Sequence, residues 1–304
     1  MDLATLADNV GTLLANGPVP PITLLPFEDD VDEDSARAAA ERVAACPHLA
    51  EVRELECRFD GLGMLEDVRG ELLACLLDSK YLTRLETLII EDNSRAEGVF
   101  AVAAAHERLP ALRRLRFASA DIASGTDVGD EGAIAIANAS FTPQLEVFEV
   151  EGGGVAAKGI RALAKRFRKL RRLSLPAVWY LTNPIEAKGA RALAAAKGLS
   201  NLTYLHLGGA DIGDEGAAAL ASASWLASVK ELDLSDNHLT ETGLLTLARS
   251  PHLRALEQLH LYSGVTAFKQ PNKVTPAVLR ALEALPRLHQ VSVVAGEWLE
   301  WPLP

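Results

Sequence analysis

The sequence contains few cysteines and few aromatic residues. It has three cysteines in 304 residues, and Phe, Trp and Tyr together make up 5% of the chain. Cys46, Cys57 and Cys75 cannot form a disulfide framework, and free thiols are typical of proteins in a reducing compartment. We therefore expect a cytoplasmic protein whose core is built mainly from aliphatic side chains.

Long apolar runs and excess positive charge are also missing. No apolar run reaches the ~18 residues that suggest a membrane-spanning helix. The acidic first residues, which include Asp2 and Asp8, lack the basic start of a secretion signal. The formal net charge of −11 argues against general binding to nucleic acid or to an anionic membrane. This charge favours solubility and is compatible with a basic partner.

The chain does contain a short unit that recurs, which is clearest at Leu199–Leu226. Leu205 and Leu207 flank a polar residue, as in a half-buried strand. The following segment, Asp214–Ser222, is rich in Ala and Leu and predicts a helix. A strand–turn–helix unit of this size cannot bury its own apolar face, so it needs a copy on each side.

Apolar pairs in the same pattern recur ten times along the chain. They are Ile22/Leu24, Leu55/Cys57, Leu88/Ile90, Leu115/Phe117, Phe148/Val150, Leu173/Leu175, Leu205/Leu207, Leu232/Leu234, Leu259/Leu261 and Val291/Val293. The second members of successive pairs are 25 to 33 residues apart. These spacings cover the range of leucine-rich repeats and slightly exceed it.

The segments LTYLHLGGADIGDEGAAALA and VKELDLSDNHLTETGLLTLA resemble leucine-rich repeats of the ribonuclease-inhibitor-like class. The resemblance covers nearly the whole chain. It implies an α/β fold, a horseshoe-shaped solenoid of about ten strand–helix repeats, with a parallel sheet on the concave face and helices on the convex face. The family consists mostly of binding scaffolds, although a fold does not fix a function.

One position of the repeat departs from the family pattern. It usually holds Asn or Cys, and Asn93 and Asn237 conform. Other residues stand there in most repeats, namely Phe27, Asp60, Ala120, Gly153, Val178, Ala210, Gly264 and Gly296. We therefore expect a weakened ladder of buried asparagines and less regular turns.

The ends of the chain predict caps on the solenoid. Asp2–Ala15 places its apolar residues on one helical face, so residues 1–18 are expected to form an amphipathic helix that covers the first repeat. Residues 19–296 would then hold the repeats. Residues 297–304, with Trp298 and Trp301, would form a C-terminal cap.

Two charged stretches each have a functional and a structural interpretation. Asp30, Asp32, Asp34 and Glu41 match calcium-loop positions, but Ser35 replaces the required Gly, so we favour an acidic helix N-terminus. The basic run within Gly159–Arg172 has the charge to dock an acidic partner or nucleic acid. A solvated helix face is the simpler interpretation.

Residues that flank each buried pair are expected to face solvent, in rows across the sheet. One row predicts an ion pair between Arg116 and Glu149. Further along, the same row aligns His206, Asp233 and His260. Two imidazoles beside a carboxylate can hold zinc, and Ser174 completes a Ser–His–Asp series.

A flat row of side chains does not converge on a metal ion, and an open sheet offers no obvious oxyanion donors. We therefore favour a charge ladder that raises the histidine pKa and contacts a partner.

Insertions between strand and helix add loops to one rim, at Ser124–Asp127, Trp179–Pro184 and Ala267–Lys273. Two of these loops bring aromatic residues beside the histidine row, as binding hot spots often require. The predicted partner-binding residues are Trp179, Tyr180, Tyr204, His206, Asp233, His260, Tyr262 and Phe268.

The sequence thus predicts a non-enzymatic protein–protein interaction scaffold, with an inhibitor or a sensor as its specific form. It carries no expected catalytic residue or cofactor. One alternative is a structural subunit of a multiprotein complex that binds through its ends or convex helices. The other is a metal site on the histidine row.

Overall fold

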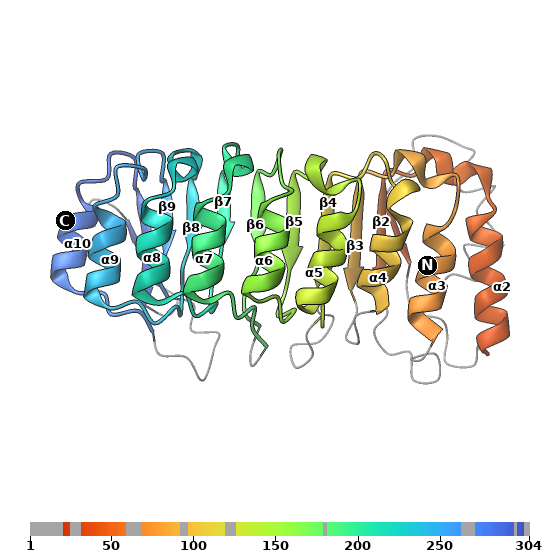
Figure 1. Cartoon of the computed structure of the whole chain (residues 1–304), viewed down its shortest axis with the longest axis horizontal. Helices are drawn as coiled ribbons and strands as arrows, with labels where there is room; N and C mark the ends of the chain where they lie inside the picture. Colours follow the sequence, from red (N-terminus) through yellow and green to blue (C-terminus); the bar gives the residue numbers. More distant parts are fainter. Residues whose placement is uncertain are drawn as a thin grey trace.

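The computed structural model of this protein is an elongated solenoid of two layers (Figure 1). It describes residues 21–24, 32–58, 68–91, 97–118, 126–178, 181–262, 271–294 and 297–300. Strands stack side by side along the long axis in one layer, and helices form the other. Each repeat runs from a strand to a helix and, in most repeats, through a 3₁₀ turn to the next strand.

The elements alternate along the chain. The strands are β1 (Ile22–Leu24), β2 (Glu54–Arg58), β3 (Thr87–Glu91), β4 (Arg114–Ala118), β5 (Val147–Val150), β6 (Arg172–Ser174), β7 (Tyr204–His206), β8 (Glu231–Asp233), β9 (Gln258–His260), β10 (Gln290–Val294) and β11 (Glu297–Glu300). The helices are α2 (Glu33–Ala44), α3 (Arg69–Leu77), α4 (Glu97–Ala104), α5 (Gly129–Asn138), α6 (Ala157–Ala164), α7 (Glu186–Ala194), α8 (Gly213–Ala221), α9 (Glu241–Ala248) and α10 (Pro276–Leu282).

Within the described residues the strands form one sheet in sequence order, from β1 to β11. Strands β1 to β10 are parallel to one another, and β11 is antiparallel to β10. The first members of the ten predicted apolar pairs all lie in one register row, from Ile22 beside Leu55 to Leu259 beside Val291. The predicted α/β leucine-rich-repeat solenoid is therefore confirmed.

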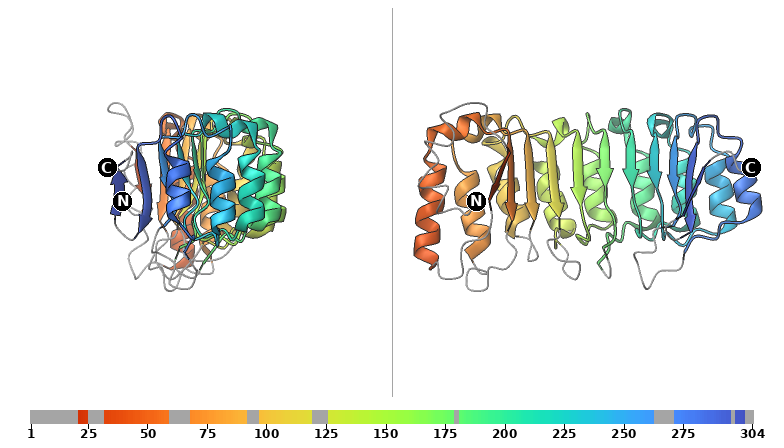
Figure 2. Two further views of the ribbon diagram at one scale, coloured as in Figure 1. Left: turned by 90° about the vertical axis from the view of Figure 1, so that its left-hand side faces the viewer. Right: turned by 180° about the vertical axis from the view of Figure 1, so that it is seen from behind.

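The core lies between the sheet and the helices. Leu205, Leu232 and Leu259 are fully buried in successive strands. Full burial of such a side chain stabilises the fold by roughly 1.5–3 kcal/mol, and every repeat adds to one continuous apolar column. Seen from one end, the middle helices lie farther out than α2 and α10, so the slab is bowed with its sheet on the inner side (Figure 2).

Neighbouring helices approach closely because a glycine recurs near the helix start. A Cβ atom at Gly159 would lie 2.7 Å from the Cβ atom of Ala133 in α5, which is too close for two carbons. Asp130 of α5 accepts hydrogen bonds from the backbone N–H groups of Ala156 and Gly159, at 3.0 and 2.6 Å. One repeat thereby satisfies the free N–H groups at the start of the next helix.

A ladder of buried asparagines is present in the described repeats, at one predicted position and two others, and Asn93 lies outside the described residues. Asn237 conforms as expected, and its Nδ2 donates to the Leu207 carbonyl at 2.6 Å. Asn183 and Asn272 likewise donate from Nδ2 to backbone carbonyls in two other repeats. The repeat pattern had placed Val178, not Asn183, at the asparagine position of the first of these repeats. Both asparagines lie within the predicted insertions, Trp179–Pro184 and Ala267–Lys273, and therefore stand farther from the preceding strand than the repeat pattern expects.

The calcium interpretation does not hold for the described residues of that stretch. Helix α2 begins at Glu33, so Asp34 and Glu41 lie within a helix rather than a calcium-binding loop. Asp32 caps this helix, with Oδ1 accepting from the Ser35 N–H at 2.9 Å. This hydrogen bond lowers the pKa of the Asp32 carboxyl below its ordinary value. Asp30 lies outside the described residues.

The predicted terminal caps remain predictions. Residues 1–20 and 301–304, which include the whole of the first predicted cap and Trp301, lie outside the described residues. Strand β11 falls within the predicted C-terminal cap and closes the sheet edge beside β10. Among the described helices, none combines the length and apolar character that crossing a bilayer requires.

Candidate functional site

Five of the eight predicted partner-binding residues lie in the part of the chain that the structure describes. Trp179, Tyr180 and Phe268 lie outside it. The other five come from β7, β8, β9 and the two residues after β9, on the side of the sheet that faces away from the helices, which we call the sheet face. The five are Tyr204, His206, Asp233, His260 and Tyr262.

The strand register brings the predicted histidine row together. His206 pairs with Asp233, and Asp233 pairs with His260. In the adjacent row, Tyr204 pairs with Glu231. We call these five side chains the histidine cluster. Tyr262 lies two residues beyond His260, which places it on the same face at the end of the strand.

Asp233 is the centre of the histidine cluster. Its Oδ2 lies 3.1 Å from Nε2 of His206 and 4.0 Å from Nδ1 of His260. Its Oδ1 accepts a hydrogen bond from the Ser235 N–H at 2.9 Å. On the far side, Nε2 of His260 lies 3.4 Å from Oε1 of Glu231. Two carboxylates and two imidazoles therefore alternate across β7 to β9.

The pKa of His206 is lowered from its ordinary value of 6.5, contrary to the sequence prediction that the ladder raises it. Burial is the largest cause because it disfavours the charged imidazole. Asp233 opposes this shift, whereas His260 and Arg172 add to it. The sequence shows the neighbouring carboxylate but not the burial, which is why the predicted direction was wrong.

A neutral His206 has one consistent hydrogen-bonding arrangement. A carboxylate only accepts, so Nε2–H donates to Asp233 and Nδ1 is left as an acceptor. The Ser174 hydroxyl oxygen lies 3.4 Å from that Nδ1 and can donate to it. Gly208 makes room for the ring, because a Cβ atom at this position would lie 2.8 Å from Nε2 of His206.

Tyr204 is held between two side chains. The guanidinium carbon of Arg172 lies 3.4 Å from the centre of its ring, in cation–π contact. The His206 ring meets it edge-on, with 6.4 Å between the ring centres. Burial raises the pKa of the Tyr204 hydroxyl, although Arg172 opposes this shift. Tyr204 thus presents a pre-ordered, half-buried aromatic edge.

Sequence reasoning did not single out Arg172, Glu231 or Gly208. The register rows contained a signal for the first two, because they place Arg172 and Glu231 on either side of Tyr204. Nothing in the sequence pattern marks Gly208, since its importance depends on where the His206 ring turns.

The predicted Arg116–Glu149 ion pair is confirmed on the same face, with 3.7 Å between Nε and Oε2. A closer contact joins Arg116 to Glu151 at 2.7 Å. Both carboxylates raise the pKa of the Arg116 guanidinium, and burial opposes them as the largest single influence. Glu149 also contacts Arg172 at 2.5 Å, so a charge ladder links β4 to the histidine cluster.

The Ser174–His206–Asp233 series does not form a hydrolytic centre. Ser174 is 6% exposed, so its hydroxyl is poorly accessible to a substrate. The neighbouring N–H groups of Leu175 and Leu207 already donate to the carbonyls of His206 and Asp233. These N–H groups therefore cannot stabilise an oxyanion.

The metal interpretation has no support in the described part of the chain. No group of three or more His, Cys, Asp or Glu side chains is arranged there to hold a metal ion. The imidazoles of His206 and His260 both lie beside Oδ2 of Asp233, so this carboxylate oxygen occupies the place between them.

Comparisons with known proteins agree with the repeat architecture. A family model described as a leucine-rich repeat matches residues 124–137, 198–221 and 226–248. The fold is similar to the crystal structure of a Bacteroides fragilis protein, with a TM-score of 0.54 and 14% sequence identity over 93% of this chain and 77% of that one. At this identity the similarity shows the fold alone. A search of curated proteins gave no match.

Proposed function

We propose that this leucine-rich-repeat protein is a non-enzymatic scaffold that binds a partner protein through the sheet face at β7 to β9. Leucine-rich repeats suggest protein interaction in general. The specific surface is our proposal, and so is the specific role, which is that of an inhibitor or a sensor. The ribonuclease-inhibitor-like class, which includes inhibitors that enclose an enzyme, also remains a prediction from the sequence resemblance.

The observation that carries this proposal is the ordered, half-buried state of the histidine cluster. His206 and His260 have 22% and 19% of their side-chain surface exposed, and Asp233 has 12%. Arg172 and His206 restrict Tyr204 from two sides. A partner that contacts these groups loses little side-chain entropy in binding, which is the advantage of a pre-organised surface.

The free cysteines support a reducing, cytoplasmic setting. All three are unpaired, and Cys46 and Cys57 are buried. Burial raises the pKa of the Cys57 thiol to about 12, so this thiol is unreactive and serves as a small apolar core residue.

Site-specific photo-crosslinking in the native cell tests the surface. A photoreactive residue at Gln258, on β9 within the sheet face, is expected to capture a partner. The same residue at Arg191, exposed on α7, serves as the control and is expected to capture none of it. Capture from Arg191 alone would favour the structural-subunit alternative.

A double variant then tests the residues. Trp179→Ala combined with Tyr204→Ala is expected to weaken capture while leaving thermal unfolding cooperative, because hot-spot aromatics contribute much of the binding energy. Thr87→Ala is a matched control, since Thr87 occupies the same register row on β3 as Tyr204 on β7. Unchanged capture by the double variant would refute the assignment.

A further inference from the structure

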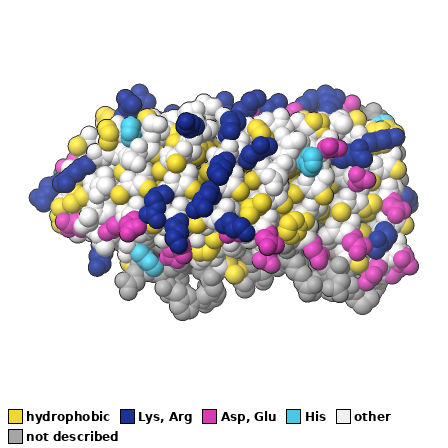
Figure 3. Space-filling model, in the orientation of Figure 1, with side chains coloured by type: hydrophobic (Ala, Val, Ile, Leu, Met, Phe, Trp, Pro, Cys, Tyr) yellow, Lys and Arg dark blue, Asp and Glu magenta, His cyan; other side chains and the backbone are white. Residues whose placement is uncertain are grey.

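Charge is distributed unevenly along this acidic protein. Residues 1–100 hold 21 Asp and Glu against 8 Lys and Arg, whereas residues 101–200 hold 9 against 15. On the helical face, Lys and Arg side chains gather over α6 and α7, and acidic side chains lie toward the N-terminal end (Figure 3). The basic run predicted in the sequence between Gly159 and Arg172 contributes to this gathering.

A groove of about 670 Å³ lies between α6 and α7 within this basic area. Its lining includes Ala164 and Ala196, which are buried and small. Its other lining residues include four exposed cations, namely Arg161, Lys165, Arg168 and Lys197. We call this feature the α6–α7 groove.

Within the part of the chain that the structure describes, the cations of the groove have no acidic partner. Among the described residues, no carboxylate lies within 4.0 Å of Arg161, Lys165 or Lys197, and Arg168 donates to the Phe167 carbonyl. Arginines near the N-terminal end behave differently, since Arg37 and Arg84 each contact a glutamate at 2.8 and 2.9 Å. The groove therefore carries a surplus of positive charge in a chain whose net charge is −11.

Stabilisation of helix ends accounts for only part of this charge. A cation in the last turn, such as Arg161 in α6, offsets the roughly half charge at a helix C-terminus. Lys165 and Arg168 follow the end of α6, and Lys197 begins a separate 3₁₀ turn, Lys197–Leu199. Four full charges exceed what one helix end requires.

The groove also continues along the solenoid. A smaller cavity of about 280 Å³ shares Ala196 and Lys197 with it and reaches Ser224 and Ser228 in the next repeat. An extended polypeptide segment fits a path that crosses two repeats, whereas a single small anion would occupy one point of it.

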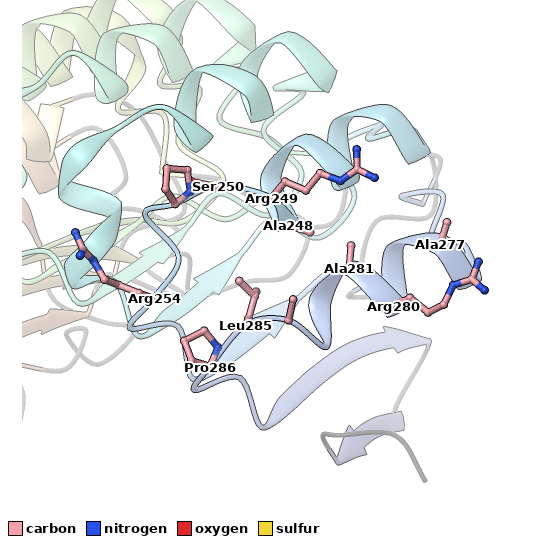
Figure 4. Close-up of a pocket in the computed structure, with 11 residues that line it drawn as sticks. Ala248, Arg249, Ser250, Arg254, Ala277, Arg280, Ala281, Leu285 and Pro286 are labelled. Atoms are coloured by element: carbon pink, nitrogen blue, oxygen red, sulfur yellow. The ribbon is translucent and has the colours of Figure 1, made fainter.

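The pocket between α9 and α10 is a useful contrast. It has about 730 Å³ and is also basic, through Arg249, Arg254 and Arg280. Arg254 points away from Arg249 and Arg280, and the apolar residues Ala281 and Leu285 lie between them (Figure 4). Size and positive charge alone therefore do not distinguish the α6–α7 groove from this pocket. The groove differs because it continues into the next repeat and because its cations are concentrated.

We propose that the α6–α7 groove binds an extended acidic segment of a partner protein, with Asp or Glu carboxylates contacting Arg161, Lys165, Arg168 and Lys197. Carboxylates complement these cations, and Arg binds them with two parallel hydrogen bonds. Nucleic acid fits less well, because the groove has no aromatic lining residue for base stacking, and Trp225 in the adjoining cavity is only 6% exposed. This surface is separate from the sheet face.

Fluorescence anisotropy with a labelled ten-residue peptide of alternating Asp and Glu tests this proposal. The native protein is expected to bind the peptide at low salt and to release it as salt rises, because exposed charges are screened. A peptide of alternating Asn and Gln controls for non-electrostatic contact and is expected not to bind.

Two triple variants with equal charge changes locate the site. Lys165→Gln with Arg168→Gln and Lys197→Gln is expected to weaken peptide binding about tenfold or more, since each contact contributes a few-fold. The control, Arg37→Gln with Arg53→Gln and Arg84→Gln, removes cations that already contact glutamates. It is expected to change binding by less than about twofold, through net charge alone.

Three results would overturn the proposal. The first is that both triple variants weaken peptide binding equally, which would mean that the effect arises from the net charge of the protein. The second is tighter binding of a ten-residue oligothymidylate than of the acidic peptide. The third is self-association of the native protein that the groove variant abolishes, which would make a second copy the occupant. Tyr204→Ala is expected to leave peptide binding unchanged, so this test is independent of the sheet-face proposal.

Discussion

Two parts of the sheet face share one register and differ in chemistry. From β2 to β6, guanidinium groups form ion pairs with carboxylates, as where Arg116 contacts Glu149 and Glu151. From β7 to β9, the equivalent positions hold imidazoles around Asp233. The first part is built from guanidinium–carboxylate pairs, whereas the second contains His206, whose pKa is lowered by burial.

The comparison shows that the strand register determines which side chains are neighbours, whereas burial determines the direction in which their pKa values shift. Arg116 has 39% of its side chain exposed and stays charged beside its glutamates. His206 has 22% exposed, and this burial lowers its pKa although a carboxylate lies 3.1 Å away. Four predictions test this comparison, from the largest expected effect to the smallest.

Removing the asparagine beneath the cluster is expected to have the largest effect. Asn237 donates to the carbonyls of Leu207 and Ser235, and its Oδ1 accepts from the Ile212 N–H. Asn237→Ala leaves buried backbone groups unpaired and is expected to lower the free energy of unfolding by about 3 kcal/mol, measured by urea denaturation. Asn138→Ala, at an exposed position, should change it by less than about 0.5 kcal/mol. Similar losses from both would contradict the role of the ladder.

The second largest loss of stability is expected from filling the space beside the His206 imidazole. In Gly208→Ala, the new methyl group would lie 2.8 Å from Nε2 of His206 and would force the ring away from Asp233. We expect a loss of about 1–2 kcal/mol and a shifted NMR signal of the His206 ring. Ser235→Ala is the matched control one repeat later, and it removes a buried hydroxyl that has no hydrogen-bond partner among the described residues. It should be neutral or stabilising.

The dependence of stability on pH separates the two parts of the sheet. The His206 pKa is lower in the folded than in the unfolded chain, so the unfolded chain binds more protons between the two values. The contribution of neutral His206 to the free energy of unfolding is therefore complete above pH 6.5 and is lost as the pH falls toward its pKa in the folded chain. His206→Gln should reduce this loss in denaturation series from pH 7.5 to 5, and cost about 1 kcal/mol at pH 7 through its hydrogen bonds.

The exposed His48 provides the control for that series. His48→Gln should leave the slope of stability against pH as it is in the native protein. If His206→Gln and His48→Gln give the same slope, the burial of His206 has no energetic consequence and the comparison fails.

The smallest effect is expected in the ladder of exposed ion pairs near the N-terminal end. Arg84 contacts Glu51 at 2.9 Å, and both side chains are about half exposed, at 48% and 57%. Arg84→Ala should cost less than about 0.5 kcal/mol because solvent screens such a pair. Thermal denaturation at low and high salt would measure it, and a loss above 1 kcal/mol would mean that the ladder stabilises the sheet cooperatively.

The register of the sheet could be predicted from the sequence because the apolar residues that recur once per repeat are the ones that must be buried. Leu205, Leu232 and Leu259 recur once per repeat and must stack, so their register follows from their positions. The same rule placed His206 beside Asp233. These inferences require only the period-two alternation of a strand and the repetition of the unit.

The remaining features depend on three-dimensional detail that spacing does not contain. Asn183 and Asn272 were missed because a loop of variable length precedes each of them, so counting from the strand fails. The direction of the His206 pKa shift was wrong because burial depends on how neighbours pack. The role of Gly208 depends on one side-chain rotamer.

The continuous parallel pairing has a consequence for how such a protein can change in length. Every junction from β1 to β10 uses the same kind of parallel backbone bonding, and Asp130 and Asp214 complete the helix starts of α6 and α9 in the repeats that follow them. An additional unit inserted between β5 and β6 would therefore move the Arg116–Glu149 pair and the imidazoles apart by about 4.8 Å, one strand width, and would break only the Glu149–Arg172 contact that joins them. Evolution or design can in this way adjust the distance between two recognition elements without altering either.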